Sequence, residues 1–288
     1  MTHCLTRRGV LALAGVAALP AARAGADTLV ERTYAGAGRF GVAARDVDDE
    51  RTGERLYRVY APVATTGRLP IVTWGNGTGS GPATYEGLLR HLASWGFAVI
   101  DSAKPNVGDG RPQLDAAAWL VAQDTTPGSP FEGRIATDRI AAAGTSQGAV
   151  GTINAATAWP DSAGVVCIAP NALPAPGDGR LGYDASLVRV PMFLIGGTRD
   201  KLISPLHVNV AAFDATPADL PAMRAMRRGA GHTEIEGDGG GDRGYLTAWL
   251  RLQLAADPFA ALAFVGGPVA EVARNPGWAN VEAKNLRG

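Results

Sequence analysis

Hydrophobic positions recur along the chain in two alternating patterns. Short apolar runs bounded by turn residues predict strands at 56–61, 69–74, 97–101, 139–143, 163–169, 190–196 and 223–227. Between them, apolar residues at helical spacing predict helices, as where Leu88, Leu92 and Trp95 precede a glycine. Further helices are expected at 114–122, at 149–158 and around Tyr245, Trp249 and Leu252. This alternation predicts an α/β fold with a mostly parallel central sheet and helices on both faces.

The pattern contains no repeat or linker that would divide the chain, so residues 25–288 are expected to form a single domain. Residues 31–60 could supply antiparallel strands at one edge of the sheet. Glycine and proline cluster at 170–182 and 229–244, which predicts surface loops after strands. Only about 20 positions separate Pro170 from Val190, too few for a cap domain, and an open cleft is therefore expected.

Residues 1–24 have the pattern of a secretory signal peptide rather than of folded structure. A basic start with Arg7 and Arg8 precedes an apolar run at 9–20, and A-x-A motifs predict cleavage near residues 24–26. The run is too short for a membrane span, which needs about 20 apolar residues. The protein is therefore expected to be exported to the periplasm or the extracellular space. The segment at 6–11 is similar to a twin-arginine signal, and a general secretory signal is the alternative.

Composition and charge narrow the class of function. Apolar residues make up 46% of the chain and charged residues 19%, which is typical of a domain with a large core. The chain has 27 basic and 27 acidic side chains, and this balance argues against a nucleic-acid partner. Cleavage would leave Cys167 as the single thiol, inside an apolar run, so we expect a buried core thiol and no intramolecular disulfide. A monomer is expected.

The strongest chemical signal is a G-x-S-x-G motif centred on Ser146. The motif follows the predicted strand at 139–143 and opens a helix, which is the setting of a nucleophile elbow. Gly144 and Gly148 would let the backbone make this tight turn without steric conflict. The alternative is a serine that caps a helix after a strand. Ser146 is the candidate nucleophile.

A serine hydroxyl needs a base, and His232 is the candidate. It follows the last predicted strand within a glycine-rich loop, and it comes after the nucleophile and the acid in the order typical of this kind of triad. His91 lies inside a predicted helix and His207 at a predicted helix start, so both are weaker candidates. His3 would leave with the signal peptide.

Asp200 is the candidate acid that orients the base. It follows an apolar strand and a glycine turn, and it lies between the nucleophile and the histidine in the chain. The alternative is a turn aspartate that pairs with Arg199 or Lys201. Glu234 and Glu236 follow the histidine too closely to lie behind it and are expected to be loop charges, or at most modulators.

Backbone N–H groups should form the oxyanion hole. One is expected from Gln147, directly after the nucleophile, and the other from the loop at 75–79, with Asn76 favoured over Gly77. That glycine-rich loop lacks the G-x-x-x-x-G-K-[ST] pattern of a phosphate-binding loop. The sequence contains no H-E-x-x-H motif or Cys/His cluster, so neither a metal nor an organic cofactor is expected.

In its order of glycine loop, elbow, aspartate and histidine, the chain resembles the α/β-hydrolase superfamily. The segments Trp74-Gly75-Asn76-Gly77 and 91–100 are similar to the bacterial polyester hydrolases and cutinase-like lipases, including poly(ethylene terephthalate) hydrolases and chlorophyllase- and dienelactone-hydrolase-like relatives. The resemblance runs from about residue 57 to 232. It implies an α/β-hydrolase fold, an ester substrate, small or polymeric, and the same nucleophile, acid, base and oxyanion donors.

Three positions depart from these relatives. Asn76, Thr145 and Asn171 stand where the resemblance would place aromatic or imidazole side chains, and the paired cysteines of the carboxyl end are absent. We assign Thr145, Asn171 and Gly77 to substrate binding and expect a more polar cleft that favours esters other than aromatic polyesters. The sequence therefore predicts a secreted serine hydrolase of carboxylic esters. A thioesterase, amidase or acyltransferase with the same triad, or a non-catalytic binding protein on this scaffold, are the alternatives.

Overall fold

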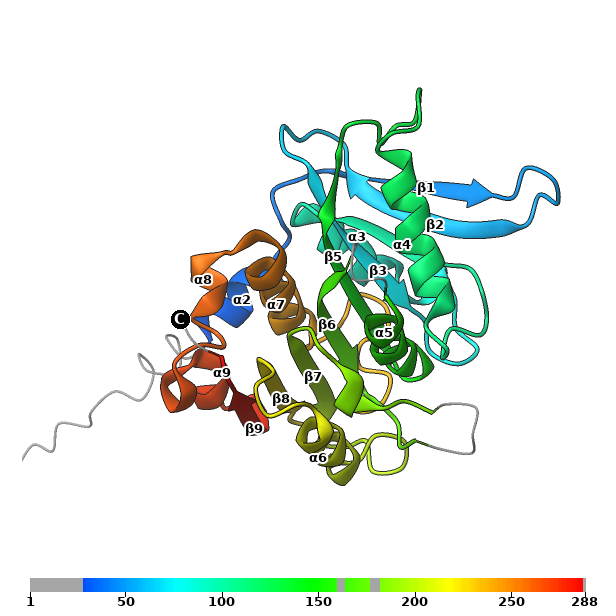
Figure 1. Ribbon diagram of the computed structural model, residues 1–288. Helices are drawn as coiled ribbons and strands as arrows, with labels where there is room; N and C mark the ends of the chain where they lie inside the picture. Colours follow the sequence, from blue (N-terminus) through cyan, green and yellow to red (C-terminus); the bar gives the residue numbers. More distant parts are fainter. Residues whose placement is uncertain (1–27, 160–163, 177–181, 287–288) are drawn as a thin grey trace, which may run out of the picture.

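The computed structural model describes residues 28–159, 164–176 and 182–286 (Figure 1). The predicted signal peptide lies outside these residues. The strands are β1 (Val42–Asp48), β2 (Arg55–Pro62), β3 (Leu69–Gly75), β4 (Ala98–Ser102), β5 (Ile135–Thr145), β6 (Val165–Asn171), β7 (Met192–Gly197), β8 (Ala222–Arg227) and β9 (Trp278–Lys284). The α-helices are α2 (Leu29–Ala35), α3 (Glu86–Ser94), α4 (Arg111–Gln123), α5 (Gln147–Ala158), α6 (Leu206–Ala215), α7 (Arg243–Ala255), α8 (Pro258–Ala261) and α9 (Glu271–Arg274). Short 3₁₀ helices are η1 (Pro82–Tyr85), η3 (Ala185–Leu187) and η4 (Gly267–Val269).

All nine of these strands form one sheet in the order β1-β2-β4-β3-β5-β6-β7-β8-β9. The six strands from β4 to β8 in this order run parallel, whereas β1, β2 and β9 pair antiparallel with their neighbours at the two edges. The predictions of a mostly parallel sheet and of an antiparallel edge from the region 31–60 are confirmed. The strand β9 at the opposite edge and the helix α2 were not predicted.

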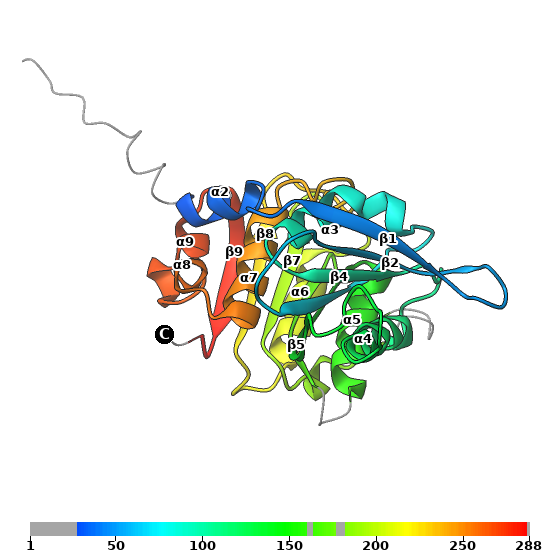
Figure 2. The ribbon, with the colours of Figure 1, turned by 90° about the horizontal axis from the view of Figure 1, so that it is seen from above.

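Helices cover both faces of the sheet, as Figure 2 shows. Side chains alternate between the faces along each central strand because the side-chain period of a strand is two residues. Val72 and Phe193 pack with α3 and α7 on one face, while the neighbouring Ile71 and Leu194 belong to clusters on the face of α4, α5 and α6. Cys167 is fully buried in the first of these clusters, as expected, and burial raises the pKa of its thiol.

The carboxyl-terminal segment is tied to the first helix of the described chain. The Trp278 indole N–H donates to Glu31 Oε1 at 2.8 Å, and Asn275 Nδ2 donates to Glu31 Oε2 at 2.7 Å. The Glu271 carboxylate accepts from the backbone N–H groups of Val30 and Glu31 at 2.7 and 2.8 Å. Trp278 is buried and begins β9, so it anchors this stretch on the domain.

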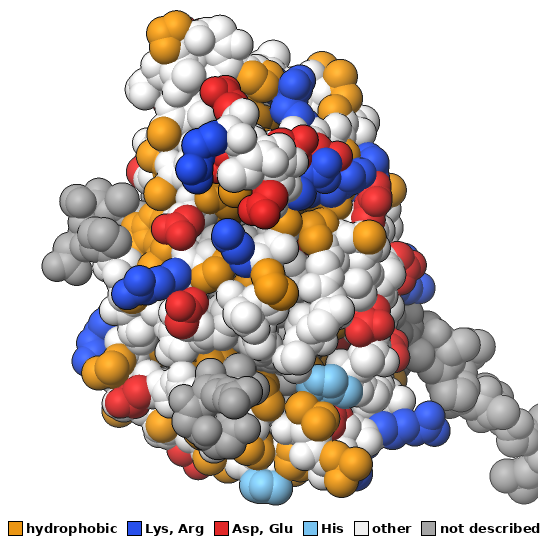
Figure 3. All heavy atoms as spheres, turned by 90° about the vertical axis from the view of Figure 1, so that its right-hand side faces the viewer, with side chains coloured by type: hydrophobic (Ala, Val, Ile, Leu, Met, Phe, Trp, Pro, Cys, Tyr) orange, Lys and Arg blue, Asp and Glu red, His pale blue; other side chains and the backbone are white. Residues whose placement is uncertain are grey.

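No cap domain covers the sheet in the part of the chain that the structure describes. Between β6 and β7 the described residues form only η3. Within residues 28–159, 164–176 and 182–286, no helix has both the length and the apolar character needed to cross a bilayer. Figure 3 shows one face, on which Lys and Arg side chains are interspersed with Asp and Glu rather than gathered into a basic surface. The absence of a nucleic-acid partner stays a prediction.

Candidate active site

Ser146 lies in a strained turn between β5 and α5. Its backbone angles are φ 55° and ψ −122°, a conformation that residues other than glycine rarely adopt. The turn is tightly packed, because a Cβ at Gly148 would lie 1.9 Å from the Gly75 oxygen, and one at Gly144 would lie 2.5 Å from the Gly148 oxygen. Both flanking glycines are therefore required by space, as the motif predicted.

The structure brings His232 between Ser146 and Asp200. His232 Nε2 lies 3.0 Å from Ser146 Oγ, and Nδ1 lies 2.5 Å from Asp200 Oδ2. Asp200 follows β7 and His232 follows β8, so parallel strands deliver the three side chains to one edge of the sheet. The Asp200 side chain is 2% exposed, and its Oδ1 accepts from the Ile203 N–H at 3.1 Å. The imidazole is 26% exposed and open to a substrate.

The two other described histidines lie elsewhere. His91 Nε2 is 2.9 Å from the Tyr34 carbonyl oxygen and 3.2 Å from Thr247 Oγ1, and burial lowers the pKa of this imidazole. His207 is the second residue of α6 and lines a separate hollow of about 340 Å³. Neither ring contacts Ser146, in agreement with the choice of His232.

Two backbone N–H groups near Ser146 are free to bind an oxyanion. Within the described ranges, the N–H groups of Asn76 and Gln147 donate to no protein acceptor. The Gly77 N–H instead donates to Tyr85 Oη at 3.2 Å. This difference favours Asn76 over Gly77 as the second donor.

The Asn76 side chain points into the protein rather than into the cleft. Its Nδ2 donates to Asp101 Oδ1 at 2.8 Å and to the Ser102 carbonyl oxygen at 3.0 Å, and the residue is 1% exposed. Burial raises the pKa of Asp101 well above its usual range, while the hydrogen bond from Asn76 opposes that shift. The amide therefore holds the oxyanion loop in place and adds no polar surface to the cleft.

Thr145 and Asn171 also differ from the expected arrangement. Thr145 lines the cleft beside Ser146, but its Oγ1 donates inward to Asn171 Oδ1 at 3.3 Å. Asn171 is 3% exposed, does not line the cleft, and donates from Nδ2 to Asp242 Oδ2 at 3.0 Å. The assignment of Asn171 to substrate binding is corrected here, because its amide is directed into the core by a hydrogen bond to the buried Asp242 carboxylate.

A cleft of about 370 Å³ opens over Ser146 and His232. Gly77 lines it, as predicted, and the sequence reasoning missed most of the other side chains. Those are contributed by Thr78, Ser80, Tyr85, Pro174, Ile203, Thr233, Ile235 and Glu236. All of them except Pro174 lie close in sequence to Asp200, to His232 or to the glycine loop, and this proximity could have indicated that they line the cleft. Glu236 thus faces the cleft, whereas Glu234 Oε1 accepts from the Gly241 N–H at 3.3 Å.

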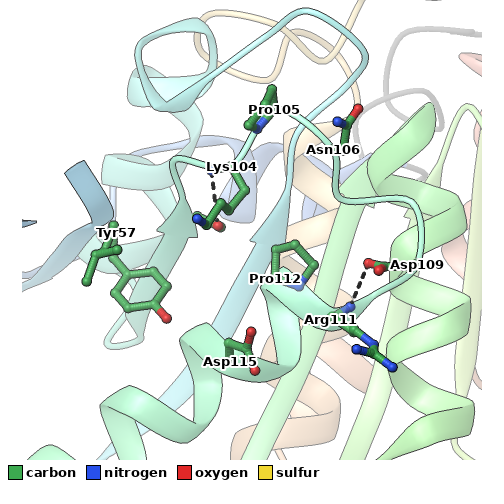
Figure 4. A pocket seen from close by; sticks show the side chains of 10 residues that line it. Tyr57, Lys104, Pro105, Asn106, Asp109, Arg111, Pro112 and Asp115 are labelled. Carbon is green, nitrogen blue, oxygen red and sulfur yellow. Dashed lines mark hydrogen bonds between the residues drawn. The ribbon is translucent and has the colours of Figure 1, made fainter. Parts of the chain in front are cut away.

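A second hollow, of about 220 Å³, lies at the carboxyl end of β4 (Figure 4). Tyr57, Lys104 and Asp115 line it, with both signs of charge. Burial and then the Asp115 carboxylate raise the pKa of Tyr57. None of the predicted site residues lines this hollow. Among the described residues, no group of three or more His, Cys, Asp or Glu side chains is arranged to hold a metal ion.

A family model described as PETase, PET hydrolase-like, matches residues 17–259. No curated protein matches the chain.

Proposed function

The chain belongs to the PET hydrolase-like family and is thus an ester hydrolase of the α/β-hydrolase kind, and from this premise we propose that it cleaves carboxylic esters through an acyl-enzyme on Ser146. The observation that carries the proposal is the position of His232, within hydrogen-bond distance of both Ser146 Oγ and Asp200 Oδ2. A base so placed can activate a hydroxyl that is otherwise a weak nucleophile.

The reaction proceeds in two steps, formation of the acyl-enzyme and its hydrolysis. Ser146 Oγ attacks the ester carbonyl carbon while His232 Nε2 takes the hydroxyl proton, and the imidazolium then gives that proton to the departing alkoxide. Water attacks the acyl-enzyme with the same base, which releases the carboxylic acid and restores the serine. Throughout both steps the Asp200 carboxylate accepts a hydrogen bond from the His232 Nδ1–H and stabilises the imidazolium.

The N–H groups of Asn76 and Gln147 hold the developing oxyanion. Neither N–H has an acceptor among the described residues, which supports this role, since a preorganised donor should be free until the substrate arrives. Gln147 also begins α5, and the positive end of a helix dipole favours negative charge there.

The cleft suits flexible esters better than stacked aromatic ones. Among the described residues that line it, Tyr85 is the one Phe, Tyr or Trp, and its ring is buried against Trp74 with 5.2 Å between the ring centroids. Ile203, Ile235 and Pro174 supply apolar contact for an acyl or alkyl chain. We therefore propose small aliphatic esters or aliphatic polyesters as substrates. The protein acts after export, a proposal supported by the sequence pattern of residues 1–24.

Covalent labelling by a fluorophosphonate tests the enzyme proposal. Wild type should be labelled and Ser146→Ala should not, and an unlabelled wild type would support a non-catalytic binding protein instead. Hydrolysis of nitrophenyl esters of rising acyl length, beside an aliphatic and an aromatic polyester film, then tests the substrate class. Matched thioester and amide substrates in the same panel decide between an esterase and the related acyl-transfer activities.

A further inference from the structure

A chain of buried hydrogen bonds runs from Asp242 to the nucleophile turn. Asp242 Oδ2 accepts from Asn171 Nδ2 at 3.0 Å, and Asn171 Oδ1 accepts from Thr145 Oγ1 at 3.3 Å. The Asn171 carbonyl oxygen also accepts from the Ser146 N–H at 3.0 Å. Asn171 therefore contacts both Ser146 and the residue before it, and Asp242 contacts Asn171.

Asp242 sets the direction of these bonds. An ionised carboxylate can only accept, so the amide nitrogen of Asn171 must face it and the amide oxygen must face Thr145. The Thr145 hydroxyl then has to donate. One buried acceptor thus orients two further side chains beside Ser146.

The bond from Asn171 is the one side-chain hydrogen bond of Asp242 within the described residues. Asp242 directly precedes α7, yet its side chain makes no capping hydrogen bond. It is 3% exposed, and its Oδ1 has no hydrogen-bond partner in the described part of the chain. A buried oxygen without a hydrogen-bond partner lowers the stability of the folded protein. We therefore attribute the presence of Asp242 at this position to its bond with Asn171.

Charged groups from three elements surround Asp242. The pKa of Asp242 is raised to about 7, with burial as the largest cause. The hydrogen bond from Asn171 and the charge of Arg227 of β8 lower this pKa, whereas Glu234 from the loop after β8 and Glu31 from α2 raise it. The Arg227 guanidinium is itself paired with Glu31 Oε1 at 2.7 Å. Asp242 therefore loses its proton as the pH rises past about 7, and its bond to Asn171 then becomes charge-assisted and stronger.

We propose that Asp242 is a positioning residue for the nucleophile, which acts through Asn171 to hold the strained backbone at Ser146 and to present Ser146 Oγ to His232. The inference rests on the proposed ester hydrolysis. The φ of 55° at Ser146 is strained, and such a conformation persists only where neighbouring contacts enforce it. Removal of the acceptor lets Asn171 turn and the Ser146 Oγ–His232 Nε2 contact lengthen.

Steady-state kinetics on nitrophenyl butyrate tests this role in wild type, Asp242→Ala, Asn171→Ala and the double variant. We expect kcat to fall by about 10- to 100-fold in each single variant, because small misplacements of reacting groups have effects of this size. KM should change much less, since neither side chain lines the cleft. The double variant should lose no more than either single variant, because both act through one chain of contacts.

The dependence of kcat on pH provides a readout that a purely structural role would not move. The acid limb reports protonation of the base. In wild type, protonation of Asp242 adds to it, so the limb should be steeper than for a single proton. Asp242→Asn is uncharged like the protonated carboxyl group and cannot titrate, so kcat near pH 8 should fall below that of wild type and the limb should have a slope of one. Asp238→Asn removes an exposed carboxylate that pairs with Arg243 and should leave both kcat and the slope unchanged.

The outcomes separate this inference from the proposed function. Labelling of wild type and loss of activity in Ser146→Ala support ester hydrolysis whatever the Asp242 variants do. A wild-type kcat in Asp242→Ala, multiplicative losses in the double variant, or an unchanged slope in Asp242→Asn would each overturn the positioning role. If Asp242→Ala does not fold, Asp242→Asn and its pH profile decide the question.

Discussion

Replacement of the buried Asp242 by asparagine should change how the stability of the protein depends on pH. Burial raises the pKa of Asp242 from its ordinary value of 3.8 to about 7. Between these two values the folded chain keeps a proton that the unfolded chain has released, so wild-type stability falls as the pH rises. The stabilising contribution is fully present below pH 3.8 and is lost as the pH passes 7. Asp242→Asn removes this dependence.

The size of the effect follows from the difference between the two pKa values. About three pH units at about 1.4 kcal/mol each give roughly 4 kcal/mol in the free energy of unfolding. About 3 kcal/mol of this falls between roughly pH 5 and pH 8. At about 2–4 °C per kcal/mol, the Tm of wild type should drop by roughly 6–12 °C relative to Asp242→Asn across that window.

Differential scanning calorimetry of both proteins at pH 5, 6, 7 and 8 measures this difference. Asp238→Asn is the matched control. The hydrogen bond from the Gly240 N–H and, to a smaller extent, the charge of Arg243 hold the pKa of Asp238 below its usual range. The titration of Asp238 is therefore complete before the window begins, and the Tm of Asp238→Asn should parallel that of wild type. If the Tm of Asp242→Asn also runs parallel to that of wild type, Asp242 does not titrate in this window and the reasoning from its burial is refuted.

Three further substitutions test the turn, the acid and the carboxyl-terminal anchor. Gly148→Ala should destabilise the protein by more than about 4 kcal/mol in urea unfolding, because its Cβ would overlap the Gly75 oxygen at 1.9 Å, and a stable, active variant would contradict the packing. Asp200→Asn should lower kcat by roughly 10⁴-fold with little change in Tm, because His232 loses its orienting carboxylate; activity within tenfold of wild type would argue against that role. Trp278→Ala should lose about 3–5 kcal/mol of stability without a change in kcat at temperatures where it is folded, and an unaltered Tm would show that the anchor is dispensable.

The sheet and the triad geometry could be predicted because both follow from local patterns. Apolar runs with turn residues at their ends marked the parallel strands. The chemistry-bearing residues follow β5, β7 and β8, and parallel strands bring their carboxyl ends to one edge. The order of Ser146, Asp200 and His232 along the chain was therefore sufficient to predict their meeting.

The directions of the Asn76 and Asn171 side chains could not be predicted in the same way. Each depends on a buried carboxylate distant in the chain, Asp101 for the first and Asp242 for the second, 25 and 71 residues away. A sequence pattern shows that an amide is present near the cleft, but the position of its partner decides whether it faces substrate or core.

The edge elements escaped prediction for a different reason. Along β9, half-buried and exposed positions follow the buried Trp278 without an apolar run, since only one side of this edge strand meets the core. The helix α2 has seven residues and two buried side chains, too few for a clear helical period. Both elements are held in place by contacts with residues distant in the sequence, such as those of Glu31.

The bonds from Glu31 to Asn275 and Trp278 bring the first and last elements of the described chain together. Since the chain ends beyond Lys284, at the other end of the seven-residue strand β9 (Figure 2), a peptide bridge that spans the length of β9 could close the polypeptide into a ring without disturbing the sheet. New ends could then be opened at the exposed turn between β1 and β2, near Gly53, which the cleft does not use. A circularly permuted chain of this kind would keep its catalytic edge while its attachment point for a carrier or a surface moves to the opposite end of the sheet.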